Sequence, residues 1–90
     1  MASNASLIEH PLPKRLRAAR ERAGLSQARL GTLAGMDPSV ASERMNQYER
    51  GVHEPKFSVV VAIATVLEVP TAYFYCLEDD LAEKLYSRAV

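Results

Sequence analysis

Two short helical segments joined by a tight turn occupy Leu25–Pro55, and this pattern constrains the fold more than any other feature of the chain. Ser26 can cap a helix over residues 27–34, because its hydroxyl can accept a hydrogen bond from a free backbone N–H of the first turn. Gly35 can end that helix in the left-handed conformation. The sequence therefore predicts a first helix that stops abruptly.

The second helix follows at once. Asp37 is a good N-cap and Pro38 suits the first helical position, so a helix is predicted over residues 38–50. Gly31 lies inside the first helix, where glycine costs about 1 kcal/mol relative to alanine. Close approach of the second helix would explain this glycine; the alternative is a glycine merely tolerated at the surface.

Helices are also predicted on both sides of this pair. Two prolines end an N-terminal segment, residues 1–13, which we expect to be a flexible tail before a helix over 14–23. Residues 57–69 contain three consecutive valines that favour a strand. Thirteen residues without a turn signal are long for a strand, and the spacing of Val60, Ile63, Ala64 and Leu67 is helical. A buried helix capped by Ser58 is predicted there.

The last segment, residues 77–90, predicts one more helix, capped by Asp79 or Asp80 and carrying Leu81 and Leu85. A short helix or turn at 72–76 precedes it, so the main domain is expected over residues 14–76. The prediction is an all-α fold of five to six helices, with the C-terminal helix as a possible dimerisation element.

Composition excludes several classes of protein. Ninety residues suffice for one domain, and no apolar run approaches the roughly 20 residues of a membrane span. The single cysteine, Cys76, excludes an internal disulfide and a cysteine-based zinc site. There is no catalytic triad pattern, phosphate-binding glycine loop or metal-ligand cluster, so we expect no enzyme, no cofactor and no metal. Without a secretory leader, the expected location is cytoplasmic.

Charge is balanced overall but unevenly distributed. Residues 1–56 hold nine basic and six acidic side chains, whereas residues 57–90 hold two basic and five acidic ones. This suggests a basic part that carries the helix pair and an acidic part with another role. The alternative is that both are simply solvated faces. Overall neutrality argues against indiscriminate binding of polyanions.

The chain resembles the Cro and phage-repressor type of helix-turn-helix regulator, the xenobiotic-response-element-like group. The residues that carry the resemblance are Arg20, Leu25-Ser26-Gln27, Leu30, Ala34-Gly35, Glu49-Arg50-Gly51, Pro55, Ala64 and Leu67-Glu68-Val69-Pro70. It covers about residues 16–74. The resemblance implies a lambda-repressor-like fold, binding to double-stranded DNA and regulation of transcription.

One departure from the family concerns the second helix, which the resemblance identifies as the recognition helix. The family's spacing from the turn glycine to the acidic-basic-glycine exit is about four residues shorter than Gly35 to Glu49. In the unshifted register Arg44 would be buried, which is costly for an unpaired charge. A shift of four residues, close to one helical turn, instead buries Met45 and Tyr48. A recognition helix lengthened by one turn is therefore predicted.

On this register the polar residues of the helix point outward and are candidates for reading bases in the major groove: Ser39, Ser42, Glu43, Asn46 and Gln47. The alternative is an ordinary polar helix surface. Phosphate contacts are expected from Gln27, Arg29, Arg44, Arg50, His53 and Lys56. The resemblance further implies that Gln27 touches the DNA backbone and braces the recognition helix. It also implies a partly buried ion pair between Arg20 and Glu49.

A single domain of this size reads half a site, so a homodimer on a palindromic operator is expected. Candidate dimer contacts are Tyr73, Tyr75, Leu81 and Leu85; Phe74 and Leu77 are expected to complete the core instead. Two other functions remain open. One is an antitoxin that binds both DNA and a toxic partner, and the other is a protein-interaction module that does not read DNA.

Overall fold

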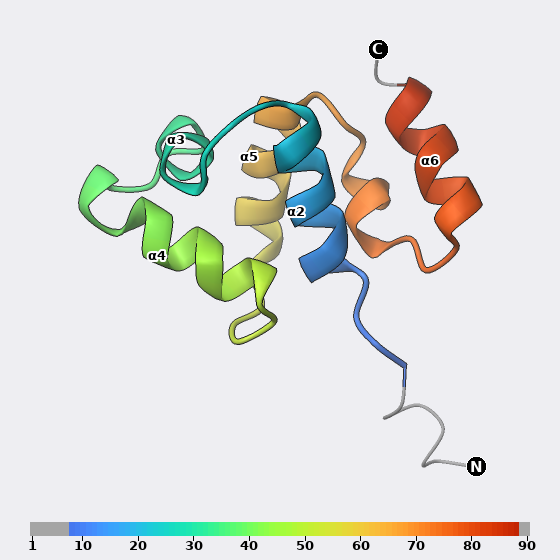
Figure 1. The fold of residues 1–90 in the computed structure, drawn as a ribbon, viewed down its shortest axis with the longest axis horizontal. Helices are drawn as coiled ribbons and strands as arrows, with labels where there is room; N and C mark the ends of the chain where they lie inside the picture. Colours follow the sequence, from blue (N-terminus) through green and yellow to red (C-terminus); the bar gives the residue numbers. More distant parts are fainter. Residues whose placement is uncertain (1–7, 89–90) are drawn as a thin grey trace.

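Six helical elements make up the computed structural model, which describes residues 8–88 (Figure 1). They are α2 (Leu12–Arg22), α3 (Gln27–Leu33), α4 (Pro38–Glu49), α5 (Phe57–Leu67), the 3₁₀ helix η1 (Thr71–Tyr75) and α6 (Asp79–Arg88). No strand occurs within this range. The all-α fold predicted from the sequence is confirmed.

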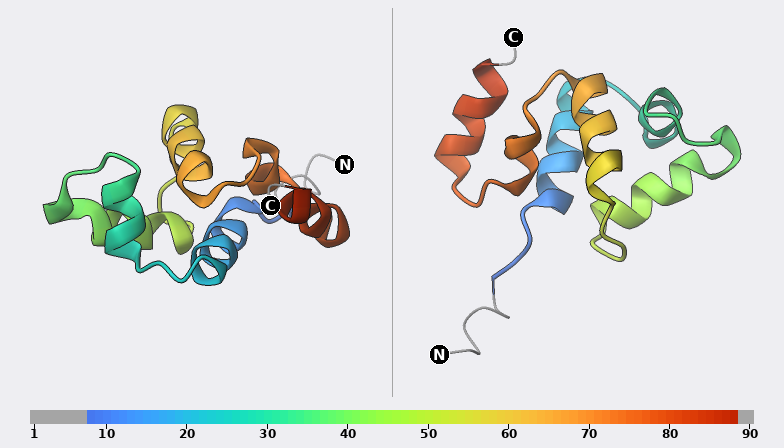
Figure 2. Two further views of the ribbon diagram at one scale, coloured as in Figure 1. Left: turned by 90° about the horizontal axis from the view of Figure 1, so that it is seen from above. Right: turned by 180° about the vertical axis from the view of Figure 1, so that it is seen from behind.

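The helices are arranged along one long axis. α3 and α4 lie at one end, α2 and α5 in the middle, and η1 and α6 at the other end (Figures 1 and 2). The core joins these parts, because each of the first five elements contributes a side chain that is almost fully buried: Leu16, Leu30, Met45, Ile63 and Phe74. The core therefore fixes α4 relative to the rest of the molecule.

The first helix begins earlier than predicted. α2 starts at Leu12 rather than at residue 14, and both Pro11 and Leu12, which were assigned to the flexible tail, are buried. His10 assists this start, because its Nδ1 accepts a hydrogen bond from the Leu12 backbone N–H at 3.1 Å. Residues 1–7 of the predicted tail lie outside the described range.

α5 confirms the predicted buried helix but not its cap. Val60, Ile63, Ala64 and Leu67 are all buried, so packing overrides the strand preference of the three valines. Lys56, not Ser58, occupies the N-cap position, and no side chain caps this helix end. The helix stops at Leu67, after which Glu68 adopts the left-handed conformation with φ of 57°.

α6 also differs from prediction at its start. The helix begins at Asp79, so Asp79 and Asp80 both lie in its first turn and neither is the N-cap. Asp79 instead accepts hydrogen bonds from Arg15 at 2.9 Å and from Lys14 at 3.3 Å. These bonds lower the pKa of the Asp79 carboxyl below its ordinary value. The carboxylate fastens α6 to α2 rather than capping its own helix.

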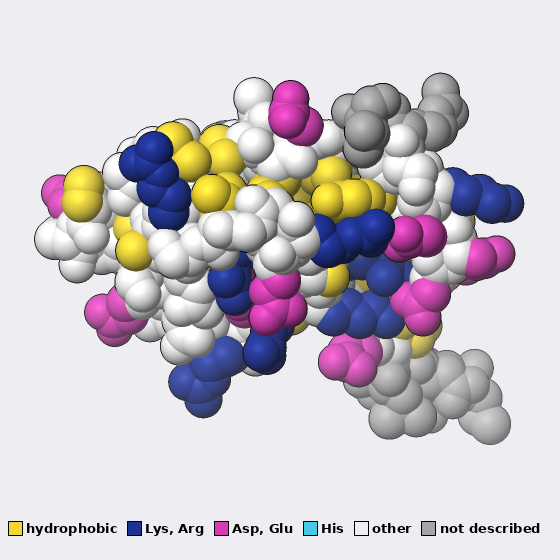
Figure 3. All heavy atoms as spheres, turned by 45° about the horizontal axis from the view of Figure 1, so that its top comes forward, with side chains coloured by type: hydrophobic (Ala, Val, Ile, Leu, Met, Phe, Trp, Pro, Cys, Tyr) yellow, Lys and Arg dark blue, Asp and Glu magenta, His cyan; other side chains and the backbone are white. Residues whose placement is uncertain are grey.

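A second set of contacts holds the other end of α6 against α2. Arg22 donates two hydrogen bonds to Glu83, both of 2.9 Å, and its guanidinium lies 3.7 Å from the centre of the Tyr86 ring. The hydrogen bonds lower the pKa of Glu83. Figure 3 shows basic and acidic side chains interleaved on this side of the molecule. Part of the uneven charge distribution along the sequence therefore serves to hold basic α2 and acidic α6 together.

Candidate nucleic-acid interface

Close contact between α3 and α4 sets the angle of the helix pair. A Cβ atom added at Gly31 would lie 2.8 Å from the Ala41 Cβ and 3.1 Å from the Ala41 carbonyl oxygen. Only glycine therefore permits this approach without movement of the backbone. Gly35 supplies the turn with a φ of +99°. Gly31 thus has a packing role and is not a tolerated surface glycine.

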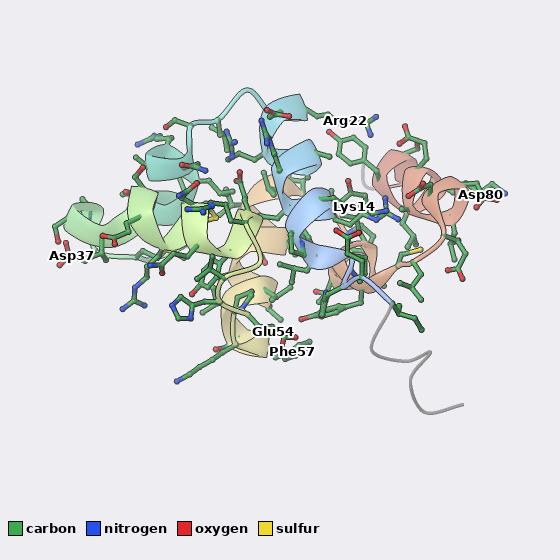
Figure 4. All side chains as sticks on the ribbon, turned by 60° about the horizontal axis from the view of Figure 1, so that its bottom comes forward. Lys14, Arg22, Asp37, Glu54, Phe57 and Asp80 are labelled. Atoms are coloured by element: carbon green, nitrogen blue, oxygen red, sulfur yellow. The ribbon has the colours of Figure 1, made fainter. Side chains whose placement is uncertain are left out.

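α4 buries the face predicted by the shifted register. Ala41 and Met45 are fully buried and Tyr48 is 8% exposed, whereas Arg44 remains at the surface. The Asp37 carboxylate caps the helix by accepting hydrogen bonds from the Ser39 backbone N–H and hydroxyl, at 2.9 and 2.7 Å. Asp37 stands at the outer tip of the molecule (Figure 4). The N-terminal end of α4 therefore lies at the edge of the molecule.

The five candidate base-reading residues lie along the uncovered side of α4. Ser39, Ser42 and Glu43 are exposed, while Asn46 and Gln47 are half-buried near its C-terminal end. Their side chains thus form one polar strip that begins in solvent and ends beside α3 and the loop after α4. A strip of amide, hydroxyl and carboxylate groups can form hydrogen bonds with base edges.

A buried ion pair holds the C-terminal end of α4 against α2. Arg20 donates to both carboxylate oxygens of Glu49, at 2.6 and 3.1 Å, and also to the Leu25 carbonyl at 2.9 Å. The side chains are only 14% and 4% exposed. The hydrogen bond with Glu49 raises the pKa of Arg20 above its ordinary value.

Gln27 joins this pair to the polar strip. Its Nε2 atom donates to Glu49 Oε1 at 3.2 Å and to Asn46 Oδ1 at 3.3 Å. Gln27 lies at the first position of α3, directly after the Ser26 cap, so the start of α3 and the end of α4 meet here. Two of the candidate DNA-contacting residues, Gln27 and Asn46, are thus joined directly through their side chains.

The cations expected to contact phosphates fall into two groups around α4. Arg44, His53 and Lys56 line a shallow hollow together with Gln47 and Glu54. Arg50 lines a second hollow on the side of α2, and Arg29 stands exposed on α3. Glu43 and Glu54 place carboxylates within the same region. The face is therefore mixed in charge rather than uniformly basic.

Sequence reasoning missed two basic residues near this face. Lys14 and Arg17 of α2 line the hollow that contains Arg50. Both are exposed, and each also lies near a carboxylate, Asp79 and Glu21 respectively. Their spacing of three residues along α2 from each other and from Arg20 was the available signal, since such residues share a helix face.

The four predicted dimer contacts differ in how far they are exposed. Tyr73 is 3% exposed and packs in the core, and Leu85 is half-buried against it. Tyr75 and Leu81 are exposed, as is Leu77, which was expected in the core. Phe74 is buried as expected. Tyr73 is thus unavailable to a partner on this surface.

Phe57 is a surface residue that the sequence analysis did not single out. It is 67% exposed at the start of α5, more than any other large apolar side chain of the described residues. Its helical phase relative to Val60 and Ala64 places it at the edge of the buried face, which was the available signal.

Within residues 8–88 no three histidine, cysteine or acidic side chains are grouped so that they could hold a metal ion. No helix in this part of the chain has the length and apolarity needed to cross a membrane.

Comparisons with known proteins agree with this geometry. The family model described as a helix-turn-helix domain matches residues 12–73. The crystal structure of transcriptional regulator BswR is similar, with 54% sequence identity and a TM-score of 0.82 over 87% of this chain and 77% of that chain. The comparison with curated proteins found no match. Since the family model covers well over half of the sequence, the chain belongs to the helix-turn-helix domain family.

Proposed function

We propose that this protein is a sequence-specific DNA-binding transcriptional regulator, a repressor of the Cro and phage-repressor subtype, that inserts α4 into the major groove. The observation that carries the proposal is the uncovered polar strip of α4, held rigidly by α3 and by the Arg20–Glu49 pair. The similarity to the transcriptional regulator BswR supports the same function.

The residues divide into two roles. Ser39, Ser42, Glu43, Asn46 and Gln47 read base edges, because their donors and acceptors lie on the uncovered side of a single helix. Gln27, Arg29, Arg44, Arg50, His53 and Lys56 contact phosphates from the flanks of that helix. Phosphate contacts position the protein, and base contacts supply the specificity.

The test separates these roles with the double variant Asn46→Ala/Gln47→Ala. We expect a loss of about 100-fold or more in preference for the operator over random DNA, because two base-reading side chains are removed. Affinity for random DNA should stay nearly unchanged and should fall steeply with salt, since phosphate contacts remain. Fluorescence anisotropy on both DNAs, at several salt concentrations, measures both quantities.

The matched control is Arg44→Ala/Lys56→Ala, which we expect to weaken binding to all sequences alike. If Asn46→Ala/Gln47→Ala loses affinity equally for every sequence, the assignment of base-reading residues is wrong. If the wild-type protein binds no DNA even at low salt, the regulator function is wrong and the interaction module is favoured. Binding to DNA that persists while a neighbouring toxic protein is neutralised would indicate an antitoxin.

The proposed regulator acts as a homodimer, and the shape of the molecule bears on which surface two copies would share. Two recognition helices must enter successive major grooves about 34 Å apart. The long dimension of the protein is 43 Å, with α4 near one end and α6 at the other (Figure 1). Two copies joined through α6 would hold their α4 helices much farther apart than one turn of DNA. A contact nearer to α4 fits a spacing of one turn of DNA better than a contact through α6.

The start of α5 satisfies this requirement. Phe57 follows the loop that leaves α4, and Val61, one turn later, is also exposed. Glu54 and Lys56, which have opposite charges, lie in the loop directly before Phe57, and both are exposed. In a symmetric dimer around Phe57, Lys56 of each copy would pair with Glu54 of the other, beside the hydrogen bond that Glu54 makes with His10 at 3.1 Å. The patch is thus complementary to itself, as a symmetric interface requires.

Replacing Phe57 by serine should abolish the dimer at micromolar concentrations while leaving the fold intact, because two-thirds of this side chain is already exposed. Affinity for a palindrome should fall to that for a single half-site, a loss of 100-fold or more by the multivalency relation. Sedimentation equilibrium and binding to both DNAs measure the effect. Leu81→Ser is the matched control at the far end, and a dimer disrupted only by Leu81→Ser would place the interface on α6.

A further inference from the structure

A chain of four side chains runs from α2 to the centre of the candidate interface. Arg20 donates to Glu49, Gln27 donates to the same carboxylate, and Gln27 also donates to Asn46. The two hydrogens of the Gln27 amide nitrogen are both used in this way. Each link joins different helices, so the arrangement exists only in the folded protein.

The chemistry of the first link fixes the direction of the others. Glu49 accepts hydrogen bonds from Arg20 through both carboxylate oxygens, and an ionised carboxylate has no hydrogen to donate. The atom of Gln27 that faces Glu49 must therefore be its NH₂ group, because the amide oxygen would be repelled. The Asn46 atom that faces the same NH₂ group must in turn be an oxygen.

Because Oδ1 of Asn46 faces Gln27, the amide nitrogen Nδ2 of Asn46 faces away from Gln27. In the described part of the chain, Nδ2 of Asn46 has no hydrogen-bond partner, and no unpaired side-chain nitrogen or oxygen is buried. Since Asn46 is half-buried, its Nδ2 must be open to solvent. The open side of α4 is the side with the polar strip.

We propose that Gln27 and Glu49 are positioning residues that make Asn46 present a hydrogen-bond donor to the DNA, so that it selects a base with a major-groove acceptor and rejects cytosine. This inference rests on the proposed function and specifies the chemistry of one base contact.

The hydrogen-bonding groups on the base edges determine which bases this donor can contact. Guanine offers N7 and O6, adenine offers N7 and thymine offers O4 as acceptors, whereas cytosine offers only its N4 amino donor. An amide free to rotate by 180° could accept from cytosine through its oxygen. With Oδ1 held by Gln27, that rotation would break the bond to Gln27 and bring two NH₂ groups together. Cytosine is therefore the disfavoured base.

Selection from a random pool of duplex DNA tests this inference, with the wild type, Asn46→Ala, Asn46→Asp and Gln27→Ala compared. The position that Asn46 reads is the one at which Asn46→Ala loses its preference. We expect the wild type to disfavour cytosine there by about tenfold. Asn46→Asp keeps an oxygen for Gln27 but presents an acceptor, so cytosine should become the preferred base at this position.

Gln27→Ala is expected to leave Asn46 in place but free to turn, so that discrimination against cytosine at this one position falls to about twofold or less. Gln47→Ala is the control, because it should alter a different position. Thermal melting checks that each variant is folded; if Asn46→Asp is unfolded, Gln27→Ala carries the test.

The possible failures are distinguishable. A wild type that prefers cytosine at this position, or a folded Gln27→Ala variant with undiminished discrimination, overturns the inference while DNA binding stands. A wild type that recovers no sequence from the pool overturns the proposed function itself.

Discussion

Replacing Arg20 by methionine is expected to lower the free energy of unfolding by about 3 kcal/mol, because it leaves the Glu49 carboxylate buried without its partner. The Glu49 side chain is 4% exposed, so water cannot replace the two hydrogen bonds that Arg20 donates. For a domain of this size the melting temperature should fall by on the order of 15 °C. Urea denaturation followed by circular dichroism measures the loss.

A neighbouring ion pair provides the control. Arg17 and Glu21 are 66% and 56% exposed, so Arg17→Met should cost less than about 1 kcal/mol. The double variant Arg20→Met/Glu49→Leu should recover most of the stability lost in Arg20→Met, since no charge is then left buried. Equal effects of Arg20→Met and Arg17→Met would show that the buried pair does not stabilise this fold.

The pair also bears on function. Arg20 and Glu49 join α2 to the end of α4, and Gln27 connects the same carboxylate to Asn46. The double variant Arg20→Met/Glu49→Leu should therefore be folded yet discriminate poorly between DNA sequences. Stability and specificity separate in this variant, because apolar side chains can fill the space but cannot orient an amide.

Gly31→Ala should destabilise the protein by about 2 kcal/mol, although alanine ordinarily stabilises a helix relative to glycine. The new methyl group would lie 2.8 Å from the Ala41 Cβ and 3.2 Å from the Ala41 Cα, and neither atom belongs to a flexible side chain. α3 and α4 must move apart to accommodate it. Thermal unfolding and operator affinity should both be reduced.

Ala41→Gly supplies the matched test of this explanation. In the double variant Gly31→Ala/Ala41→Gly the shortest contact disappears. Its loss of unfolding free energy should therefore be smaller than the summed losses of the two single variants, by at least about 1 kcal/mol. If the two effects simply add, or if Gly31→Ala stabilises the protein, close packing at this crossing is not the reason for the glycine.

Helix α4 shows how far sequence alone can predict this protein. The shifted register placed Met45 and Tyr48 inside and the polar strip outside, and the structure agrees. This was predictable because burying Arg44 would have been costly, whereas one extra turn keeps the helix face unchanged. The predicted N-caps Ser26 and Asp37 are also confirmed, and they too depend only on residues nearby in the sequence. The Ser58 cap was wrong, because α5 begins two residues earlier than that pattern suggests.

Contacts between distant residues were beyond local patterns. The sequence analysis did not indicate that Arg15, 8% exposed, donates to the Cys76 carbonyl at 2.9 and 3.1 Å, 61 residues away. A charged residue is usually solvated, so the burial of Arg15 depends on the carbonyl groups that the fold brings to it. The hydrogen bond from Arg22 to Glu83 was equally beyond local patterns. It joins the basic and acidic parts of the chain, which the sequence suggested have separate roles.

By itself, the sequence determined the tight helix pair, the inward and outward faces of α4, and membership of the helix-turn-helix family, because caps, glycines and helical periodicity act within a few residues. Only the tertiary structure decided that α6 is held against α2, that Phe57 is exposed, and that Gln27 holds the oxygen of Asn46. The physical reason is that a side chain's exposure and hydrogen-bond direction depend on groups that folding brings together from distant parts of the chain.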